Sequence, residues 1–205
     1  VLALVFIEGA NSGNGYNSED AAQGGTGYVP VSLQYKPYTA KTARDPSIAG
    51  GDPLEKFTNR SYKGKSATAS NTSDLGMVLD TRKKMKEKPV IVSAHLSNPS
   101  VFAEYEKQAN AILITFGVQD QAVLDILTGI AEPAALLPLQ IPANMETVET
   151  QLEDVPHDMK CHVDSEGHTY DFAFGLNWKG RIQDKRTEKY QKKGQRTKDK
   201  VKSKK

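Results

Sequence analysis

Cysteine, tryptophan and long hydrophobic runs are scarce in this sequence of 205 residues. Cys161 is its single cysteine, which excludes a disulfide within the chain. No stretch approaches the roughly 20 consecutive apolar residues that a membrane-spanning helix needs. We therefore expect neither a disulfide framework nor a membrane partner.

Charge is distributed unevenly along the chain, although the formal net charge is only +2. Residues 185–205 contain 11 Lys and Arg and 2 acidic residues, so this segment carries +9 while the residues before it carry −7. Basic segments bind nucleic acids through the phosphates, but this one has only Tyr190 as an aromatic residue and so offers no stacking platform. We predict one domain over residues 1–184, a disordered basic tail over 185–205, and no nucleic-acid partner.

The N-terminal part of the chain predicts one strand followed by a long insertion. Val1–Ile7 is a continuous apolar run that is typical of a strand covered on both faces. Because the chain begins inside this strand, we expect it to be truncated there, with an exposed apolar sheet edge. Glu8–Thr72 is dense in Gly, Ser, Thr, Asn and Pro without helical periodicity, and insertions of this length are usually functional. Within it, Val29–Tyr35 predicts a short edge strand, since Pro30 is poorly tolerated in a central one.

Helices and strands alternate from Ser73 onward. Ser73 is the predicted N-cap of a helix over Asp74–Lys88, which Pro89 ends. The other predicted elements are strands over Val90–His95, Ala111–Phe116, Leu136–Ile141 and Tyr170–Trp178, a helix capped by Ser100, and a helix over Asp120–Thr128 that ends at Gly129. This alternation predicts an α/β fold: a mostly parallel open sheet sandwiched between helices, with a long Gly/Ser/Thr-rich insertion after the first strand. Ligands on such sheets lie outside the carboxyl ends of the strands.

The same segments resemble the C-terminal α/β sandwich domain of glycoside hydrolase family three, the β-glucosidase family. The resemblance covers about residues 85–180 and rests on the order and spacing of the motifs Leu96-Ser-Asn-Pro99, Ala109-Asn-Ala-Ile-Leu113, Phe116-Gly-Val-Gln-Asp-Gln-Ala122, Pro133-Ala-Ala-Leu-Leu-Pro138 and Phe172-Ala-Phe-Gly-Leu-Asn-Trp178. It extends to Val1–Glu8, which is similar to the family's strand ending in Gly-Glu. The turns at Gln119–Gln121 and at Ala135 and Leu136 depart from the family pattern, so we identify a divergent subgroup.

This resemblance implies a retaining, exo-acting β-glucosidase-like hydrolase whose Asp nucleophile lies on a separate N-terminal (β/α)8 barrel. In many members, a Glu on the loop after the Gly-Glu strand acts as general acid and base. Direct spacing lands on Ser12–Asn14, which contains no carboxylate, so Glu19 is the first candidate for that role and Glu8 is the alternative. The competing interpretations are a solvated loop acid for Glu19 and a strand-end carboxylate that caps backbone amides for Glu8.

The segment Ser47–Tyr62 combines aromatic residues with acidic and basic ones. In a sugar site, aromatic rings stack on pyranose faces while carboxylates or Arg bind hydroxyls, which makes Asp52, Arg60 and Tyr62 candidate substrate-binding residues. The same composition suits an interface that packs against the barrel, and the interface is the interpretation we favour.

Two further motifs are better explained by ordinary structure. The Gly-rich stretch Ala10–Ser18 follows a strand but lacks the helix N-terminus that a phosphate loop requires directly behind it. A hairpin that turns at Ser165–Gly167 explains four potential metal ligands whose spacing fits no standard site: His157, Cys161, His162 and His168. We predict no metal and no cofactor.

The sequence therefore leaves two functions open. The first is the C-terminal domain of a β-glucosidase-like enzyme, with the barrel of the same polypeptide and a carbohydrate as partners and, by resemblance, a periplasmic or secreted location. The second is a non-catalytic carbohydrate-binding or structural α/β domain. Under the first, the isolated chain is expected to be inactive because it lacks the nucleophile.

Overall fold

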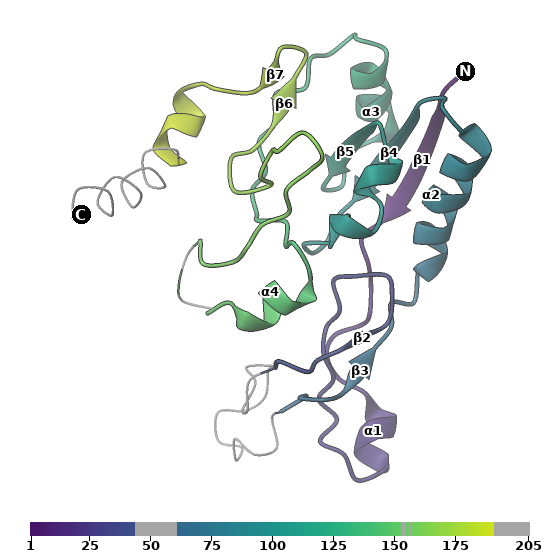
Figure 1. Ribbon diagram of the computed structural model, residues 1–205, viewed down its shortest axis with the longest axis vertical. Coiled ribbons are helices and arrows are strands. Elements are labelled where there is room, and N and C mark those ends of the chain that lie inside the picture. Colours follow the sequence, from purple (N-terminus) through teal and green to yellow (C-terminus); the bar gives the residue numbers. More distant parts are fainter. Residues whose placement is uncertain (44–60, 153–154, 156, 191–205) are drawn as a thin grey trace.

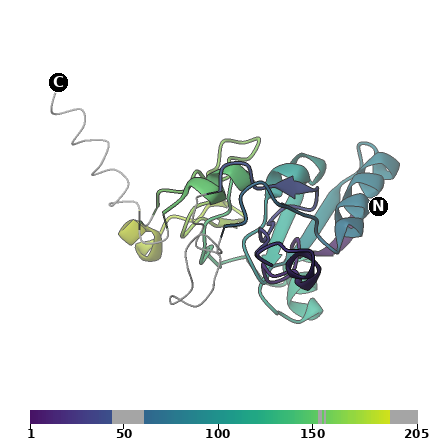
Figure 2. The same ribbon diagram turned by 90° about the horizontal axis from the view of Figure 1, so that it is seen from below.

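The computed structural model describes residues 1–43, 61–152, 155 and 157–190, so Asp52, Arg60 and the tail beyond Tyr190 lie outside the described residues. Figure 1 shows an α/β body, a lobe that extends from the end of the first strand, and a C-terminal segment beside the body, an arrangement that Figure 2 shows from below. The body contains β1 (Ala3–Glu8), α2 (Thr72–Met85), β4 (Val90–His95), β5 (Ala111–Thr115) and α3 (Asp120–Leu127). The lobe contains α1 (Ser18–Ala22), β2 (Tyr38–Thr39) and β3 (Ser66–Ala67), and the C-terminal segment contains α4 (Met145–Thr150), β6 (Leu176–Asn177) and β7 (Gly180–Arg181).

The core of the body is a parallel sheet in the order β1-β4-β5. β4 is central, and its Val90, Val92 and Ala94 are completely buried, as a strand covered by neighbours on both sides requires. β1 forms one edge of the sheet in the described residues, and Phe6 on that strand is exposed. The expected truncation at this strand stays a prediction. The parallel α/β class is therefore confirmed, with three strands in the sheet among the described residues.

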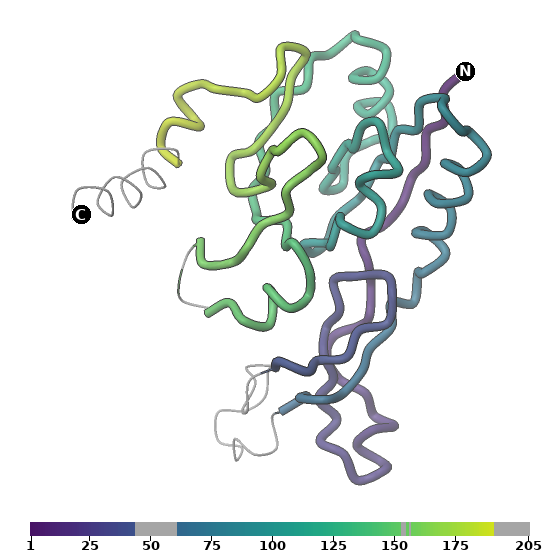
Figure 3. Tube along the Cα trace, viewed as in Figure 1, coloured from purple at the N-terminus to yellow at the C-terminus, as the bar shows by residue number. Residues whose placement is uncertain are grey.

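α2 covers one face of the sheet with Leu75 and Val78, which are both buried. The helix begins two residues earlier than predicted, because Asn71 rather than Ser73 occupies the N-cap position. The Asn71 amide does not cap the helix. It accepts a hydrogen bond from the Asn11 N–H at 2.9 Å and donates one to the Gly9 carbonyl at 3.1 Å. The start of the helix is thereby tied to the loop that leaves β1, and Figure 3 traces the chain out of β1, through the lobe and back into α2.

The predicted helix after Ser100 and the predicted strand Val29–Tyr35 are both wrong, for a related reason. Two 3-10 turns, η2 (Phe102–Glu104) and η3 (Glu106–Gln108), replace the helix. The Glu104 carboxylate accepts hydrogen bonds from the Tyr35 and Lys36 amides, and the Val101 N–H donates to the Leu33 carbonyl at 2.8 Å. These bonds satisfy the backbone around Tyr35 without a neighbouring strand and hold the turns against the lobe.

The predicted strands Leu136–Ile141 and Tyr170–Trp178 are also wrong as members of the parallel sheet. They pair with each other instead: the Leu137 N–H donates to the Phe174 carbonyl at 2.7 Å, and the Ile141 N–H donates to the Tyr170 carbonyl at 3.0 Å. Prolines at 138 and 142 remove backbone donors and prevent a regular ladder.

Other local predictions are confirmed. α3 closely follows the predicted range, and Gly129 after it has a φ of 78°, the left-handed conformation expected beyond a helix end. The turn at Ser165–Gly167 lies in a hairpin closed by an antiparallel bridge between Val163 and Thr169. No helix in the described part of the chain is long and apolar enough to cross a membrane.

Arg82 joins the C-terminal end of α2 to the chain that enters β5. Its Nε donates to the Gln108 carbonyl at 2.7 Å, its Nη2 donates to Asn110 Oδ1 at 2.6 Å, and its Nη1 donates to the carbonyls of Lys86 and Lys88. Asn110 Oδ1 also accepts from the Val90 N–H at 2.9 Å, so the contact reaches the start of β4.

We expect Arg82→Ala to lower the free energy of unfolding by about 2 kcal/mol, because it leaves several acceptors without their charged donor. Lys83→Ala on the exposed side of the same helix is the matched control, with an expected change below about 0.5 kcal/mol. Urea denaturation of both variants measures this difference, and equal midpoints would contradict it.

Candidate functional site

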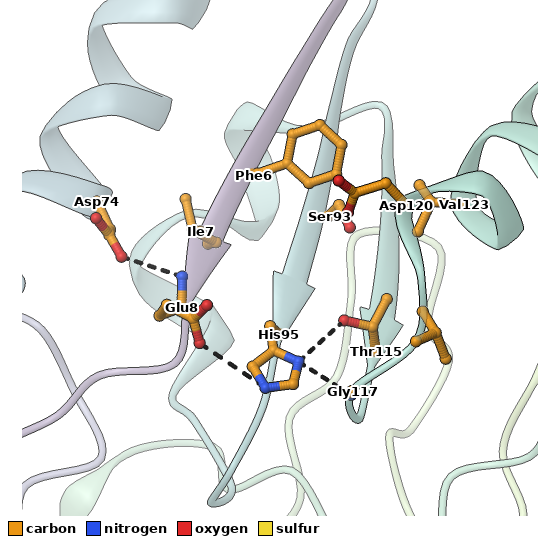
Figure 4. A pocket seen from close by; sticks show the side chains of 11 residues that line it. Phe6, Ile7, Glu8, Asp74, Ser93, His95, Thr115, Gly117, Asp120 and Val123 are labelled. Atoms are coloured by element: carbon orange, nitrogen blue, oxygen red, sulfur yellow. Dashed lines mark hydrogen bonds and ion pairs between the residues drawn. The ribbon is translucent and has the colours of Figure 1, made fainter.

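A pocket of about 490 Å³ lies at the carboxyl ends of the parallel strands. Figure 4 shows that side chains from β1, β4, β5 and the start of α3 converge there. The strand register places Glu8 beside His95 and His95 beside Thr115, so three polar side chains lie in a row at this edge. This is the position at which ligands bind on open parallel sheets.

His95 is held in one tautomer that faces Glu8. The Gly117 N–H donates to His95 Nδ1 at 3.1 Å, so Nδ1 acts as the acceptor and, in the neutral ring, the proton lies on Nε2. Nε2 lies 4.0 Å from Glu8 Oε2, and the Glu8 side chain is 65% exposed. The exposed Glu8 carboxylate thus lies near a histidine N–H, without a hydrogen bond between them.

The backbone at the end of β1 is fixed by other side chains. The Glu8 N–H donates to Asp74 Oδ2 at 3.0 Å, and the Tyr35 hydroxyl donates to the Glu8 carbonyl. Asp74, rather than Glu8, is thus the carboxylate that caps a backbone amide here.

Glu19 lies in the lobe, away from the pocket. It occupies the first turn of α1, where Asn17 Oδ1 accepts a hydrogen bond from the Glu19 N–H at 2.8 Å, and its side chain is exposed. Figure 1 places α1 at the far end of the lobe from β1, so the structure does not bring Glu8 and Glu19 together. The neighbouring Asp20 is structural: hydrogen bonds from Lys65 Nζ at 2.5 Å and from the Gly27 N–H hold the pKa of its carboxyl below the usual value.

Tyr62, the one described member of the three predicted substrate-binding residues, contacts a buried carboxylate. Its hydroxyl donates to Glu149 Oε2 at 3.3 Å, and the Tyr38 hydroxyl donates to Glu149 Oε1 at 2.9 Å. Glu149 lies in α4 and is 8% exposed, so this cluster joins the lobe to the C-terminal segment. The substrate-binding role of Tyr62 stays a prediction.

The potential metal ligands of the C-terminal segment are separated in space. His157 lies 3.6 Å from Asp171, and His168 Nδ1 lies 3.1 Å from Asp164 Oδ2. His162 is buried, and its Nε2 lies 3.9 Å from Glu106 Oε2. Across the described ranges, no group of three or more His, Cys, Asp or Glu is placed to hold a metal ion.

Glu8 is the one pocket residue that the sequence offered as a site candidate, and side chains such as Phe6, Ser93, His95 and Asp120 were missed. Phe6, Ser93 and His95 lie on correctly predicted strands near the carboxyl ends, and Asp120 is the first residue of α3, the helix that follows β5. The rule that parallel strands end at one edge was therefore a sufficient signal, had it been applied to each strand's last residues.

The fold and the position of the pocket define an α/β domain with a pocket at the carboxyl edge of a parallel sheet. The sequence model of the glycosyl hydrolase family 3 C-terminal domain matches residues 57–178, which is more than half of the chain. The chain belongs to this family.

The curated relatives are much longer than this chain. Probable beta-glucosidase C of Aspergillus oryzae is 36% identical over 99 residues, which cover 46% of this chain and 16% of the relative. Beta-glucosidase C of Emericella nidulans is 37% identical over 84 residues, or 41% of this chain and 14% of the relative. The periplasmic beta-glucosidase/beta-xylosidase of Dickeya chrysanthemi is 26% identical over 120 residues, which cover 58% of this chain and 17% of the relative. The chain thus spans about a sixth of these relatives, and no solved structure matches it significantly.

We expect His162 to make stability depend on pH. Burial lowers the pKa of His162 below 6.5, although Glu106 opposes the shift. Below about pH 6.5 the unfolded chain binds a proton that the folded chain resists, so the free energy of unfolding falls as the pH falls toward the folded pKa. We therefore expect the free energy of unfolding to be lower at pH 5.5 than at pH 7.5 because of this residue.

Chemical denaturation at the two pH values tests this expectation. His162→Gln removes the titrating group and should flatten the pH dependence. An unchanged slope in His162→Gln would show that another group is responsible.

Proposed function

We propose that this chain is the C-terminal domain of a retaining, exo-acting β-glucosidase-like glycoside hydrolase. It completes the active site over a nucleophile on a (β/α)8 barrel of the same polypeptide. The observation that supports this most is membership in the glycosyl hydrolase family 3 C-terminal domain family together with relatives that are named beta-glucosidases. The name of the Dickeya relative, a periplasmic enzyme, also supports a periplasmic or secreted location.

Retaining hydrolysis needs two carboxylates about 5 to 5.5 Å apart, one that attacks the anomeric carbon and one that donates and then accepts a proton. Under this proposal the barrel supplies the first, and this chain supplies the second. Glu19 is our first candidate because its exposed carboxylate lies on a lobe that projects beyond the sheet, where a second domain can approach it. Glu8 is the alternative because it lies at the strand end and faces His95.

In the full-length polypeptide, we expect Glu19→Gln to lower kcat/KM for aryl β-glucosides with poor leaving groups by roughly 10²- to 10⁴-fold. With dinitrophenyl glucoside, whose leaving group needs no proton, the variant should lower the rate of the glycosylation step by a smaller factor. Azide, which attacks without a general base, should restore turnover of that substrate. Glu146→Gln is the matched control, because Glu146 is also exposed in the first turn of a short helix.

Glu8→Gln separates the two candidates. If Glu8 is the acid and base, this variant shows the leaving-group dependence and azide rescue, and Glu19→Gln does not. If neither variant shows them, the chain does not supply the proton. A non-catalytic carbohydrate-binding or structural domain is then favoured, in agreement with the absence of a carboxylate in Ser12–Asn14.

The isolated chain of 205 residues should not hydrolyse aryl β-glucosides, because the nucleophile is expected on the barrel. Release of nitrophenol from the purified chain, compared with the full-length polypeptide at equal molarity, measures this. Turnover at a comparable rate would overturn the division of the active site between two domains.

A further inference from the structure

We propose that Asn14 is a site of spontaneous deamidation, a modification that converts this asparagine to aspartate or isoaspartate. Asn14 lies between β1 and α1, where the chain enters the lobe, and its residue is exposed. It is the one asparagine in the sequence that directly precedes a glycine, Gly15. The inference concerns the chemistry of this chain's own backbone and does not depend on the proposed function.

The reaction joins the backbone of Gly15 to the side chain of Asn14. The Gly15 nitrogen loses its proton to a solvent base and attacks Asn14 Cγ, which closes a five-membered succinimide ring. The side-chain nitrogen takes a proton from water and leaves as ammonia. A second water then opens the ring at either of its two carbonyl carbons, which gives aspartate or isoaspartate. A side chain on the attacking residue would crowd this ring closure, and glycine has none.

The Asn14 side chain is held on the side where the ring must close. Its Oδ1 accepts a hydrogen bond from the Tyr16 N–H at 3.2 Å, so the side-chain carbonyl is directed along the chain toward the residues that follow. Attack on Cγ places negative charge on this same oxygen, and a backbone N–H already aimed at it stabilises that charge. Because Asn14 is exposed, water also reaches the ring that must be opened.

The fold requires glycine at the attacking position. Gly15 has a φ of 82°, in the left-handed region that residues with a side chain rarely adopt. A Cβ atom at this position would lie 3.3 Å from Val31 Cγ2 and 3.5 Å from the Val29 carbonyl oxygen. A bulkier residue that shielded Asn14 would therefore strain the turn, so the reactive pair is a consequence of the local backbone.

Other asparagines of the chain supply internal controls. Asn11 and Asn177 share the side-chain geometry of Asn14, because the Oδ1 of each accepts from the N–H two residues further on, at 3.0 and 2.9 Å. Their successors are Ser12 and Trp178, whose side chains crowd the attack. Asn98 is exposed but precedes a proline, which has no N–H to lose. These sites separate the effect of the glycine from that of exposure and of the hydrogen bond.

Mass spectrometry of the aged full-length polypeptide tests the proposal. Samples kept at 37 °C at pH 6 and pH 8 are digested, and the exchange of NH2 for OH is located by fragmentation. We expect Asn14 to react at least roughly tenfold faster than Asn11 and Asn177, and Asn98 not to react by this route. The rate at Asn14 should be higher at pH 8, because the attacking nitrogen must lose its proton. Asn14→Gln, which would need a larger ring, should remove the fast reaction.

Three results would overturn the site. The first is an equal rate at Asn14 and Asn11 in the folded polypeptide, and the second is a fast mass change that persists in Asn14→Gln. The third is reaction of Asn14 only after unfolding in urea, which would show that the fold protects it.

The modification should also change the backbone at the base of the lobe. Isoaspartate adds one backbone atom directly before two hydrogen bonds, from the Val29 N–H to the Gly15 carbonyl at 3.0 Å and from the Asn17 N–H to the Gly27 carbonyl at 2.8 Å. We expect faster amide hydrogen exchange at Val29 in the isoaspartate form than in Asn14→Asp, which adds the charge without the extra atom. Equal exchange in the two forms would overturn this part of the proposal.

Discussion

The central position of β4 between two parallel neighbours determines where chemistry is placed in this molecule. Both edges of β4 are hydrogen bonded, and its core-facing side chains at Val90, Val92 and Ala94 are fully buried, so the register of all three strands is fixed by one buried face. That register aligns Glu8, His95 and Thr115. A shift of one residue in either pairing would turn these side chains to opposite faces. The alignment of Glu8, His95 and Thr115 at the carboxyl edge of the sheet is therefore a consequence of core packing as much as of these polar residues themselves.

The lobe depends on the same strand end. Its connections to the sheet pass through the Tyr35 hydroxyl at the Glu8 carbonyl and through Asn71, which contacts the loop after β1. Asp74, at the start of α2, accepts from the Glu8 amide and from the Asn71 side chain. Residues far apart in the sequence thus fix one short stretch of backbone. The long insertion is anchored at the edge where a ligand would approach, although α1 and Glu19 extend away from it.

Sequence patterns correctly predicted the elements that pack against or pair with other helices and strands. They failed where a distant side chain, rather than a neighbouring strand, forms the hydrogen bonds of the backbone. β1, β4, β5, α2 and α3 follow apolar patterns with clear stop signals and were predicted as such. Val29–Tyr35 alternates like a strand, but the carboxylate of Glu104 satisfies its amides from a distance of 69 residues in sequence. Pairing of Leu136–Ile141 with the chain near Tyr170 is likewise a long-range outcome. Glu8 was a candidate through the family resemblance and its catalytic role stays a prediction, whereas Ser93 is marked only by its place near the carboxyl end of a strand.

The two faces of the sheet are unequal, and this asymmetry explains why a pocket exists beside β1. α2, η2 and η3 cover one face with Leu75, Val78, Phe102 and Tyr105. On the other face α3 contributes only Val123 as a buried side chain. A helix is about 10 Å in diameter and strands lie about 4.8 Å apart, so one helix covers roughly two strands. Among the described residues, α3 follows β5 and leaves the same face of β1 without a helix, and Phe6 is half-exposed there, beside Ser93. The polar residues at the carboxyl edge of this face follow from the register of β4.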